Sequence, residues 1–199
     1  MARPNQRDQK RVELLPVIAE AFSELGYHRA TTAELAARCG IQENVLYRLW
    51  TDKQEMFIAS IDFLCHSRLK TWSALASANE AVSSTAQRML ENEAQQVGEL
   101  RMYRLIFAAL AETDDPKIRR SVRKMYRQYQ SALTKAISAH RQPNDESLPS
   151  AELSAWAAIG LVTVINIISE LDLVSRRERN QLFSEVAGFL LDGTPPLDR

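Results

Sequence analysis

Residues 32–51 combine the residue types that two short, closely crossing helices require. Ala36 is small enough for a second helix to cross over it, and Gly40 can take the positive φ of a tight turn. Apolar side chains are spaced to fill the angle between the helices, at Leu35, Ile41, Leu46 and Leu49. A second helix held in this way can lie in a DNA major groove with its N-terminal side chains on base edges. The segment therefore indicates either a DNA-reading helix-turn-helix or an ordinary helical hairpin.

Motifs for the common enzymatic chemistries do not occur in the sequence. It has no Glu-x-x-His pair for a di-iron centre, no phosphate-binding glycine loop and no nucleophile elbow. Cys39 and Cys65 lie far apart without a CxxC pair, and His66 beside Cys65 has no metal-ligand spacing. We therefore expect no enzyme, no cofactor and no metal site, and we interpret Cys65 and His66 as structural. An all-helical enzyme without a motif remains an alternative.

The balance of basic and acidic side chains indicates whether a nucleic acid is a plausible partner. Basic and acidic side chains number 25 each, and a net charge of zero argues weakly against a nucleic-acid binder. A local patch can suffice, and the first residues supply one at Arg3, Arg7, Lys10 and Arg11. A second basic run, Lys117 to Arg127, lies opposite an apolar stripe, so we interpret it as a solvated helix face.

The sequence favours a cytoplasmic protein that does not enter a membrane. The N-terminus lacks the apolar run of a signal peptide. The longest apolar stretch, residues 155–168, is interrupted by Thr163 and Asn166 and is shorter than the ~20 apolar residues of a membrane span.

Apolar periodicity predicts an all-α fold of about nine helices, and no segment alternates as a strand would. The first helix covers 8–25 and ends at Gly26, with Pro16 either starting it or kinking it. A short helix follows the capping box of Thr31 and Glu34, and a second runs over about 43–49. Longer helices are expected at about 53–75, 84–97, 99–112, 117–140, 150–173 and 176–192.

Residues 26–57 resemble the DNA-binding segment of the TetR family of repressors. The resemblance rests on Gly26-Tyr27, Thr31-Thr32, Leu35-Ala36, Gly40-Ile41, Leu46-Tyr47, Trp50 and Lys53. It implies a three-helix helix-turn-helix domain over residues 1–52 and a helical effector-binding and dimerisation domain over 53–199. It also implies a homodimer that binds double-stranded, palindromic operator DNA and is released by a small-molecule effector.

The same resemblance implies roles for individual side chains at the DNA. Base readers would be Gln42, Asn44 and Arg48, and phosphate contacts would come from Thr31, Thr32, Tyr47 and Lys53. The sequence departs from the family pattern at Gln42, Glu43 and Leu49-Trp50, where the family commonly has His-Phe or Tyr-Phe. Gln42 stands where the family usually has Ser or Thr and is a poor N-cap, and Glu43 adds an acid that repels phosphate. The departures at Gln42 and Glu43 motivate the alternative of a helical ligand-binding dimer that does not bind DNA specifically.

The C-terminal half carries no motif of its own. By resemblance we expect a dimer interface on the last two helices, at Ala155, Ala158, Val162, Leu182, Val186 and Phe189. Candidate effector-pocket residues are Phe63, Trp72, Met89, Tyr103, Phe107, Tyr126, Tyr129 and Trp156, with Asn166 as a polar group that needs a partner. The aromatic content favours an apolar or aromatic effector. Burial inside one subunit remains the alternative for every residue of both sets.

Overall fold

The computed structural model describes residues 6–77, 84–96, 102–141 and 148–193, and these residues form nine helices and no strand. The predicted all-α fold is therefore confirmed for the part of the chain described. The helices are α1 (Gln6–Arg29), α2 (Thr32–Arg38), α3 (Glu43–Leu49), α4 (Lys53–Ser77), α5 (Thr85–Gln96), α6 (Met102–Ala111), α7 (Pro116–His140), α8 (Ala151–Glu170) and α9 (Arg176–Asp192).

The first helix is longer than the sequence pattern predicts. It begins at Gln6 and continues past Pro16 to Arg29, so the alternative in which Pro16 starts the helix is wrong. The only non-helical backbone angles inside α1 belong to Gly26, with φ 72° and ψ 174°. Glycine reaches this region without the steric cost of a Cβ. The chain therefore bends at Gly26 and makes one more helical turn, which carries Tyr27 and His28.

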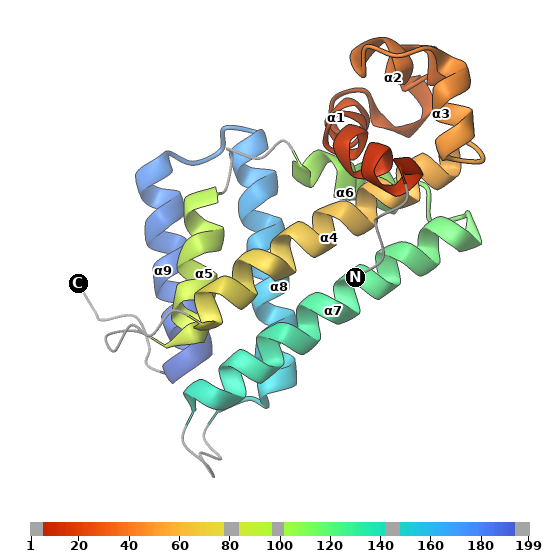
Figure 1. Ribbon diagram of the computed structural model, residues 1–199. Coiled ribbons are helices and arrows are strands. Elements are labelled where there is room, and N and C mark those ends of the chain that lie inside the picture. Colours follow the sequence, from red (N-terminus) through yellow and green to blue (C-terminus); the bar gives the residue numbers. More distant parts are fainter. Residues whose placement is uncertain (1–5, 78–83, 97–101, 142–147, 194–199) are drawn as a thin grey trace. The chain divides into compact units, whose positions relative to one another are not determined.

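The described residues fall into two compact units. The first comprises residues 1–68 and 101–126, and the second comprises residues 69–100 and 127–199. Both α4 and α7 begin in the first unit and end in the second (Figure 1). The boundary that we expect at residue 52 falls inside the first unit, and its functional meaning stays a prediction.

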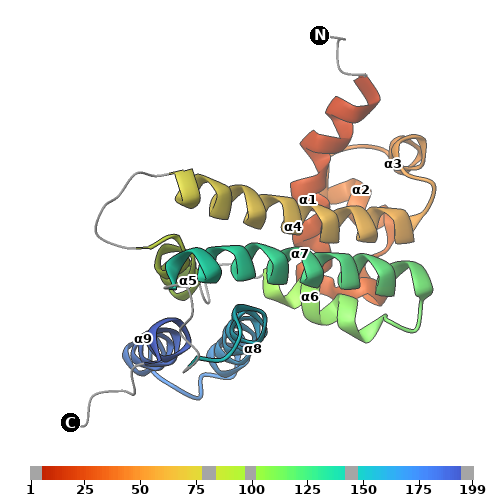
Figure 2. The ribbon, with the colours of Figure 1, turned by 90° about the horizontal axis from the view of Figure 1, so that it is seen from below.

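In the first unit, α1 packs along α6 and also contacts α2 and α3 (Figures 1 and 2). An aromatic cluster joins α1 to α4. The ring of Phe57 lies 4.9 Å from that of Phe22 and 4.8 Å from that of Tyr27, measured between centroids. Burying a large apolar side chain stabilises a fold by about 1.5–3 kcal/mol. This cluster therefore fixes the start of α4 against the end of α1.

In the second unit, α8 and α9 pack against each other and α5 contacts both. Both ends of α9 are capped. Ser175 and Glu178 form a complete capping box at its start, and Gly193 takes a left-handed conformation (φ 67°) at its end. These caps satisfy backbone groups that a helix otherwise leaves without partners.

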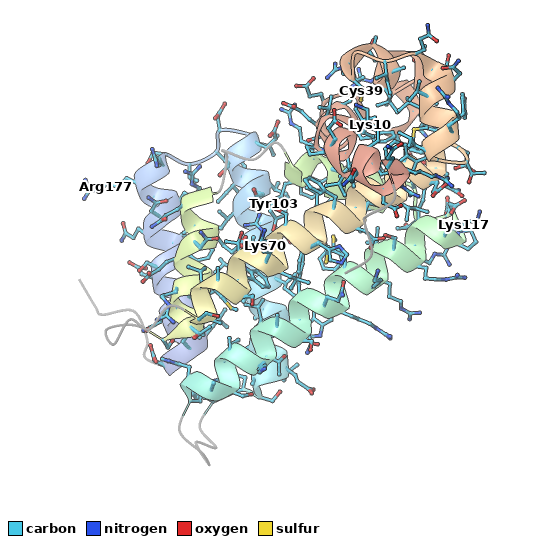
Figure 3. All side chains as sticks on the ribbon, in the orientation of Figure 1. Lys10, Cys39, Lys70, Tyr103, Lys117 and Arg177 are labelled. Atoms are coloured by element: carbon cyan, nitrogen blue, oxygen red, sulfur yellow. The ribbon has the colours of Figure 1, made fainter. Side chains whose placement is uncertain are left out.

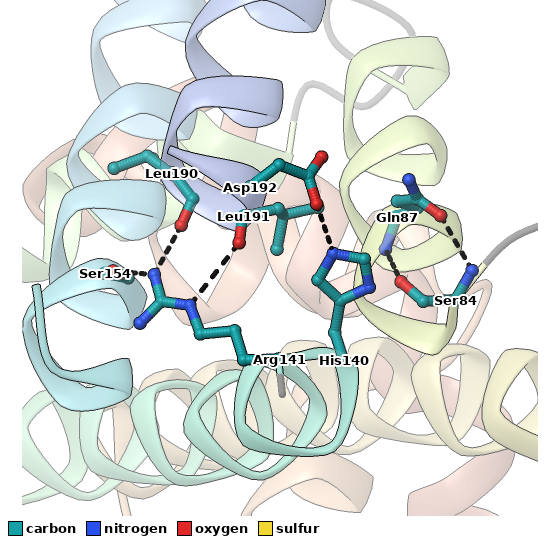
Figure 4. Close-up of polar contacts among 8 residues, drawn as sticks. All are labelled: Ser84, Gln87, His140, Arg141, Ser154, Leu190, Leu191 and Asp192. Carbon is teal, nitrogen blue, oxygen red and sulfur yellow. Dashed lines mark hydrogen bonds and ion pairs between the residues drawn. The ribbon is translucent and has the colours of Figure 1, made fainter. Parts of the chain in front are cut away.

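Arg141 joins the end of α7 to α8 and α9 (Figure 4). Its guanidinium donates hydrogen bonds to Ser154 Oγ (2.7 Å) and to the carbonyl oxygens of Leu190 (2.6 Å), Leu191 (3.4 Å) and Pro149. Carbonyls in the last turn of a helix have no intrahelical donor and carry partial negative charge, so a cation there is favourable. Beside it, His140 Nε2 lies 2.6 Å from Asp192 Oδ1. One side chain therefore holds three helix ends together.

By length and composition alone, α8 could cross a membrane. Its 20 residues have a mean hydropathy of 1.7 in the most apolar window, of which 33% is buried. The expectation that the apolar stretch is too short was therefore wrong, because the helix extends beyond residues 155–168 at both ends. Length does not decide the matter, since apolar helices of this kind also occur inside folded domains.

We predict that Arg141→Ala lowers the free energy of unfolding by about 2–4 kcal/mol, because several hydrogen bonds from one charged donor are lost and helix carbonyls are left without partners. Urea unfolding followed by circular dichroism measures the change. Arg177→Ala is the matched control, since that side chain projects from α9 into solvent (Figure 3). If both variants unfold like the wild type, Arg141 does not hold this junction.

Candidate nucleic-acid interface

α2, the turn after it and α3 form the two crossing helices that the sequence predicts. Ala36 is buried where the helices meet, and its carbonyl accepts a hydrogen bond from Ile41 N at 3.1 Å. Gly40 has a φ of 64°, in the region that side chains rarely adopt. The turn therefore needs a glycine at this position for its backbone conformation, since open space surrounds the site where a Cβ would stand.

The two helices differ in how they begin. Thr31 caps α2, and its Oγ1 accepts a hydrogen bond from Glu34 N at 3.2 Å. The second half of the expected capping box does not form, because the Glu34 carboxylate accepts from Arg38 Nε instead (2.9 Å). Gln42 caps α3 with no side-chain hydrogen bond, as expected of a poor N-cap. The start of α3 is therefore held by packing rather than by a cap.

The C-terminal end of α3 is fixed by a fully buried Trp50. The guanidinium of Arg11 lies over the indole ring at 5.2 Å and donates to Glu55 at 2.9 Å. Arg7 donates to the carbonyl oxygen of Leu49 at 2.9 Å. Burial raises the pKa of Glu55, but hydrogen bonds from Thr51 and Arg11 outweigh it and leave the pKa below its ordinary value.

Arg7 and Arg11 therefore support the orientation of α3 from the first turns of α1. From the sequence both residues are expected in a basic patch, and this structural role is not predicted. The only available signal was their position, one helical turn apart on the same side of a helix.

Lys53, expected to bind a phosphate, is engaged inside the unit. Its Nζ donates to the carbonyl oxygen of Tyr27 at 3.0 Å and lies 4.5 Å from the centre of the Tyr27 ring. Burial and the nearby acids Asp52, Glu112 and Asp115 raise the pKa of Tyr27. The lysine therefore closes the bend at Gly26 onto the start of α4, and its contact with DNA stays a prediction.

The remaining expected DNA residues lie on one open surface. Gln42, Asn44 and Arg48 are all exposed on α3, and within the described part of the chain none of the three makes a side-chain hydrogen bond. Tyr47 is also exposed, at 49%. The opposite side of α3 is buried through Leu46 and Leu49. A short polar helix face backed by a firm core is the arrangement that base recognition requires.

Three of the polar groups on this surface are bonded to one another. The hydroxyl of Thr32, in the first turn of α2, donates to the carboxylate of Glu43. The same hydroxyl oxygen lies 3.2 Å from the phenol oxygen of Tyr47. The family resemblance implies that Thr32 and Tyr47 contact phosphates, but it does not predict their link to Glu43.

Two contacts connect this part of the first unit with α6 and α7. His28 Nε2 lies 2.9 Å from Glu112, just after α6, and Gln54 donates to Asp115 at 2.7 Å. Asp115 also accepts from the backbone of Ile118 and Lys117 at the start of α7. Those hydrogen bonds, led by the one from Ile118, lower the pKa of Asp115.

The candidate pocket residues are divided between the two units, and their grouping stays a prediction. Phe63, Tyr103, Phe107 and Tyr126 belong to the first unit, whereas Trp72, Met89, Tyr129 and Asn166 belong to the second. Asn166 is buried and donates to the carbonyl oxygen of Val162 in the preceding turn at 2.7 Å. Trp156 is 47% exposed, so its prediction as an inward-facing residue was wrong.

In the second unit, a buried polar contact lies beside these aromatic rings. Trp72 Nε1 donates to the buried carboxylate of Glu93 at 3.0 Å, and the rings of Trp72 and Tyr129 lie 5.4 Å apart.

The expected dimer residues on α8 were assigned to the wrong face. Ala155, Ala158 and Val162 are buried within the second unit, on the side of α8 that carries its buried residues. The open face of α8 lies on the other side, at Leu153, Trp156, Ala157, Gly160, Val164, Ile167 and Leu171. Apolar residues occur on both faces, which is why periodicity did not separate them. On α9, Leu182 and Phe189 are exposed as expected and Val186 is half-buried.

The other sequence features are solvated or buried as expected. The basic residues Lys117, Arg120 and Arg123 are exposed, and Lys117 projects into solvent (Figure 3). Cys65 is buried, and burial raises the pKa of the half-buried Cys39 thiol, which makes it less reactive. Among the described residues no group of His, Cys, Asp and Glu side chains could hold a metal ion.

Comparison with known proteins identifies related sequences. A sequence model of the bacterial regulatory proteins of the tetR family matches residues 14–60, which include the whole of α2 and α3. The nucleoid occlusion factor SlmA of Photobacterium profundum is 30% identical over 109 residues, which are 54% of this chain and 48% of that protein. The chain spans about half the length of the curated relatives it matches.

Solved structures match over much more of the chain. A TetR-family transcriptional regulator from Cytophaga hutchinsonii has a TM-score of 0.74 at 17% identity, with 100% of both chains covered. A transcriptional regulator from Saccharomonospora viridis, solved in complex with choline, has a TM-score of 0.72 at 15% identity, over 89% of this chain and 94% of that chain. At these identities the likeness shows the fold.

We predict that Lys53→Ala lowers the free energy of unfolding by about 1–2 kcal/mol, because a charged hydrogen bond and a cation–π contact with Tyr27 are both lost. Arg48→Ala is the matched control, since Arg48 is exposed and removing it leaves stability nearly unchanged. Chemical unfolding of the three proteins measures the difference. Equal stability of Lys53→Ala and wild type would contradict a structural role for Lys53.

Proposed function

We propose that the protein is a ligand-responsive transcriptional repressor. Its residues 14–60 match the sequence model of the tetR family of bacterial regulatory proteins, and the chain has the fold of a solved TetR-family regulator. In this proposal residues 1–52 bind DNA, residues 53–199 bind an effector and dimerise, and the protein acts in the cytoplasm without catalysing a reaction. The homodimer binds a palindromic operator and releases it when a small-molecule effector binds.

The exposed polar face of α3 carries this proposal. Asn44 and Arg48 extend from a helix whose other side is buried, and no hydrogen bond within the described residues occupies their side chains. Asparagine can pair bidentately with adenine and arginine with guanine in the major groove. The position of these residues within the segment that matches the family supports their role as base readers, with Gln42 beside them.

Dimerisation is supported by the open apolar face of α8 and α9. Large apolar side chains are exposed there in one continuous series of turns, including Leu153, Val164 and Ile167. Gly160 lies in the middle of the α8 face, with nothing within 4 Å of where a Cβ would stand, so a partner helix can approach closely. Exposed apolar surface of this kind is costly in water and marks an interface. We propose that a second copy of the chain covers it.

The effector is proposed to bind among the aromatic side chains of residues 53–199. The fold neighbour from Saccharomonospora viridis was solved with choline, which supports small-molecule binding by this fold. Tyr103, Phe107, Tyr126 and Tyr129 are half-buried, so their rings retain some surface for a ligand. Their chemistry favours an apolar or aromatic effector. Binding would favour a conformer in which the two α3 helices no longer match the operator.

We predict that purified protein selects a palindromic site from a pool of random duplex DNA at fixed salt. Two half-sites are expected, one helical turn of about 34 Å or a multiple of it apart, because a two-fold dimer presents two α3 helices. Arg48→Ala should weaken binding by about 1–3 kcal/mol per base contact and relax the preference at one base pair in each half-site. Sequencing the selected pool measures both effects.

Arg177→Ala, an exposed change in α9 outside the interface with DNA, is the control for this selection. A folded dimer that enriches no sequence would contradict the repressor proposal. That result would favour a helical ligand-binding dimer without a specific DNA target.

We predict that Val164→Glu converts the dimer to a monomer, because a carboxylate in the middle of an apolar interface loses its hydration without gaining a partner. Val164 is 51% exposed in one copy of the chain, so the substitution leaves each subunit folded. Sedimentation velocity measures the mass, and Val12→Glu on the exposed side of α1 is the control. A Val164→Glu dimer of wild-type stability would show that another surface mediates dimerisation.

A further inference from the structure

The link between Thr32, Glu43 and Tyr47 has a fixed direction. A threonine hydroxyl has one hydrogen, and that of Thr32 is donated to the carboxylate of Glu43. The Thr32 oxygen can then only accept from the Tyr47 phenol, 3.2 Å away. The two hydrogen bonds therefore run in one direction, from Tyr47 to Thr32 and from Thr32 to Glu43. Neither hydroxyl hydrogen is available to an external acceptor while these two hydrogen bonds persist.

The Glu43 carboxylate, which accepts the last hydrogen bond of this series, resembles the DNA phosphate that Thr32 and Tyr47 are proposed to bind. A carboxylate and a DNA phosphate both present charged oxygens that accept hydrogen bonds from hydroxyl groups. Glu43 is exposed on the surface that carries Asn44 and Arg48. A phosphate that approaches Thr32 and Tyr47 therefore meets a negative charge that already occupies their hydrogen bonds.

We propose that Glu43 is an intramolecular competitor for the DNA phosphate at Thr32 and Tyr47, and that it weakens binding to DNA of any sequence. Binding must break the Thr32–Glu43 hydrogen bond and move the carboxylate away from the phosphate. This cost applies to every sequence, whereas only the operator offsets it through contacts with bases. Glu43 thus lowers non-specific and operator binding by the same factor, and contacts with bases keep only the operator bound. This inference rests on the proposed function, because it requires that the surface binds DNA.

The test compares wild type, Glu43→Ala and Glu43→Gln by fluorescence anisotropy with a random-sequence duplex at three fixed salt concentrations. Glu43→Ala should bind this duplex on the order of ten-fold more tightly, since two hydroxyl donors are freed and one repulsive charge is removed. Glu43→Gln should gain less, because its amide oxygen still accepts from Thr32. Glu34→Ala is the matched control, with the same change of charge in the same helix-turn-helix and no contact with either hydroxyl.

A double-mutant cycle tests the hydrogen-bond chain itself. Tyr47→Phe should weaken binding to random DNA more in the Glu43→Ala background than in the wild-type background, because the phenol reaches the phosphate only when Glu43 is absent. Circular dichroism confirms that each variant is folded. Additive effects of the two substitutions would overturn the competition between Glu43 and phosphate.

The remaining outcomes separate this inference from the proposed function. If the wild type selects an operator but Glu43→Ala gains no more than Glu34→Ala, only the inference fails. If Glu43→Ala instead loses affinity and one cytosine preference in each half-site, Glu43 reads a base and the inference is overturned. If no variant binds DNA of any sequence, both the proposed function and the inference fail.

Discussion

A helix of seven residues is too short to persist in water by itself, so α3 depends on the side chains it buries. Those are Leu46 and Leu49, and the fully buried Trp50 that follows. Arg11 lies over the Trp50 ring and pairs with Glu55, while Arg7 holds the carbonyl of Leu49. These contacts stabilise α3 through its buried face. Its exposed face can therefore carry polar side chains suited to recognition.

This constraint bears on the DNA-binding surface proposed for a chain with no net charge. Arg7, Arg11, Arg38 and Lys53 are basic, yet each makes a hydrogen bond within the first unit. Their charges therefore stabilise the helix-turn-helix. The recognition surface itself relies on few charges, chiefly Arg48 and the opposing Glu43. Such a surface obtains little binding from the DNA backbone alone and depends more on base contacts.

The sequence predicted the helices well because Gly, Pro and capping residues mark their ends. It also predicted the crossing at Ala36 and the turn at Gly40, which follow from local steric rules. The local rules failed where a competing partner, near or distant in the sequence, takes the side chain. Glu34 pairs with Arg38 rather than completing the capping box, and Lys53 is held by Tyr27, 26 residues away.

The error on α8 has a different origin. Ala155, Ala158 and Val162 form one apolar face and Trp156, Val164 and Ile167 form another. Periodicity predicts a single buried stripe, so it cannot rank two stripes on one helix. Only the packing of α9 identifies the inner face, and that information lies outside the helix.

The chain passes between its two units at residues 68–69, 100–101 and 126–127. The first and third of these passages lie inside the continuous helices α4 and α7. A regular helix resists sharp bending unless a proline, a bulge or an inserted side chain breaks its hydrogen bonds, and residues 53–77 contain no proline. The first turn of α4 carries Glu55, which pairs with Arg11 beneath α3, and Lys53, which holds Tyr27. In the proposed function, the continuous helix α4 joins residues of the second unit to these contacts.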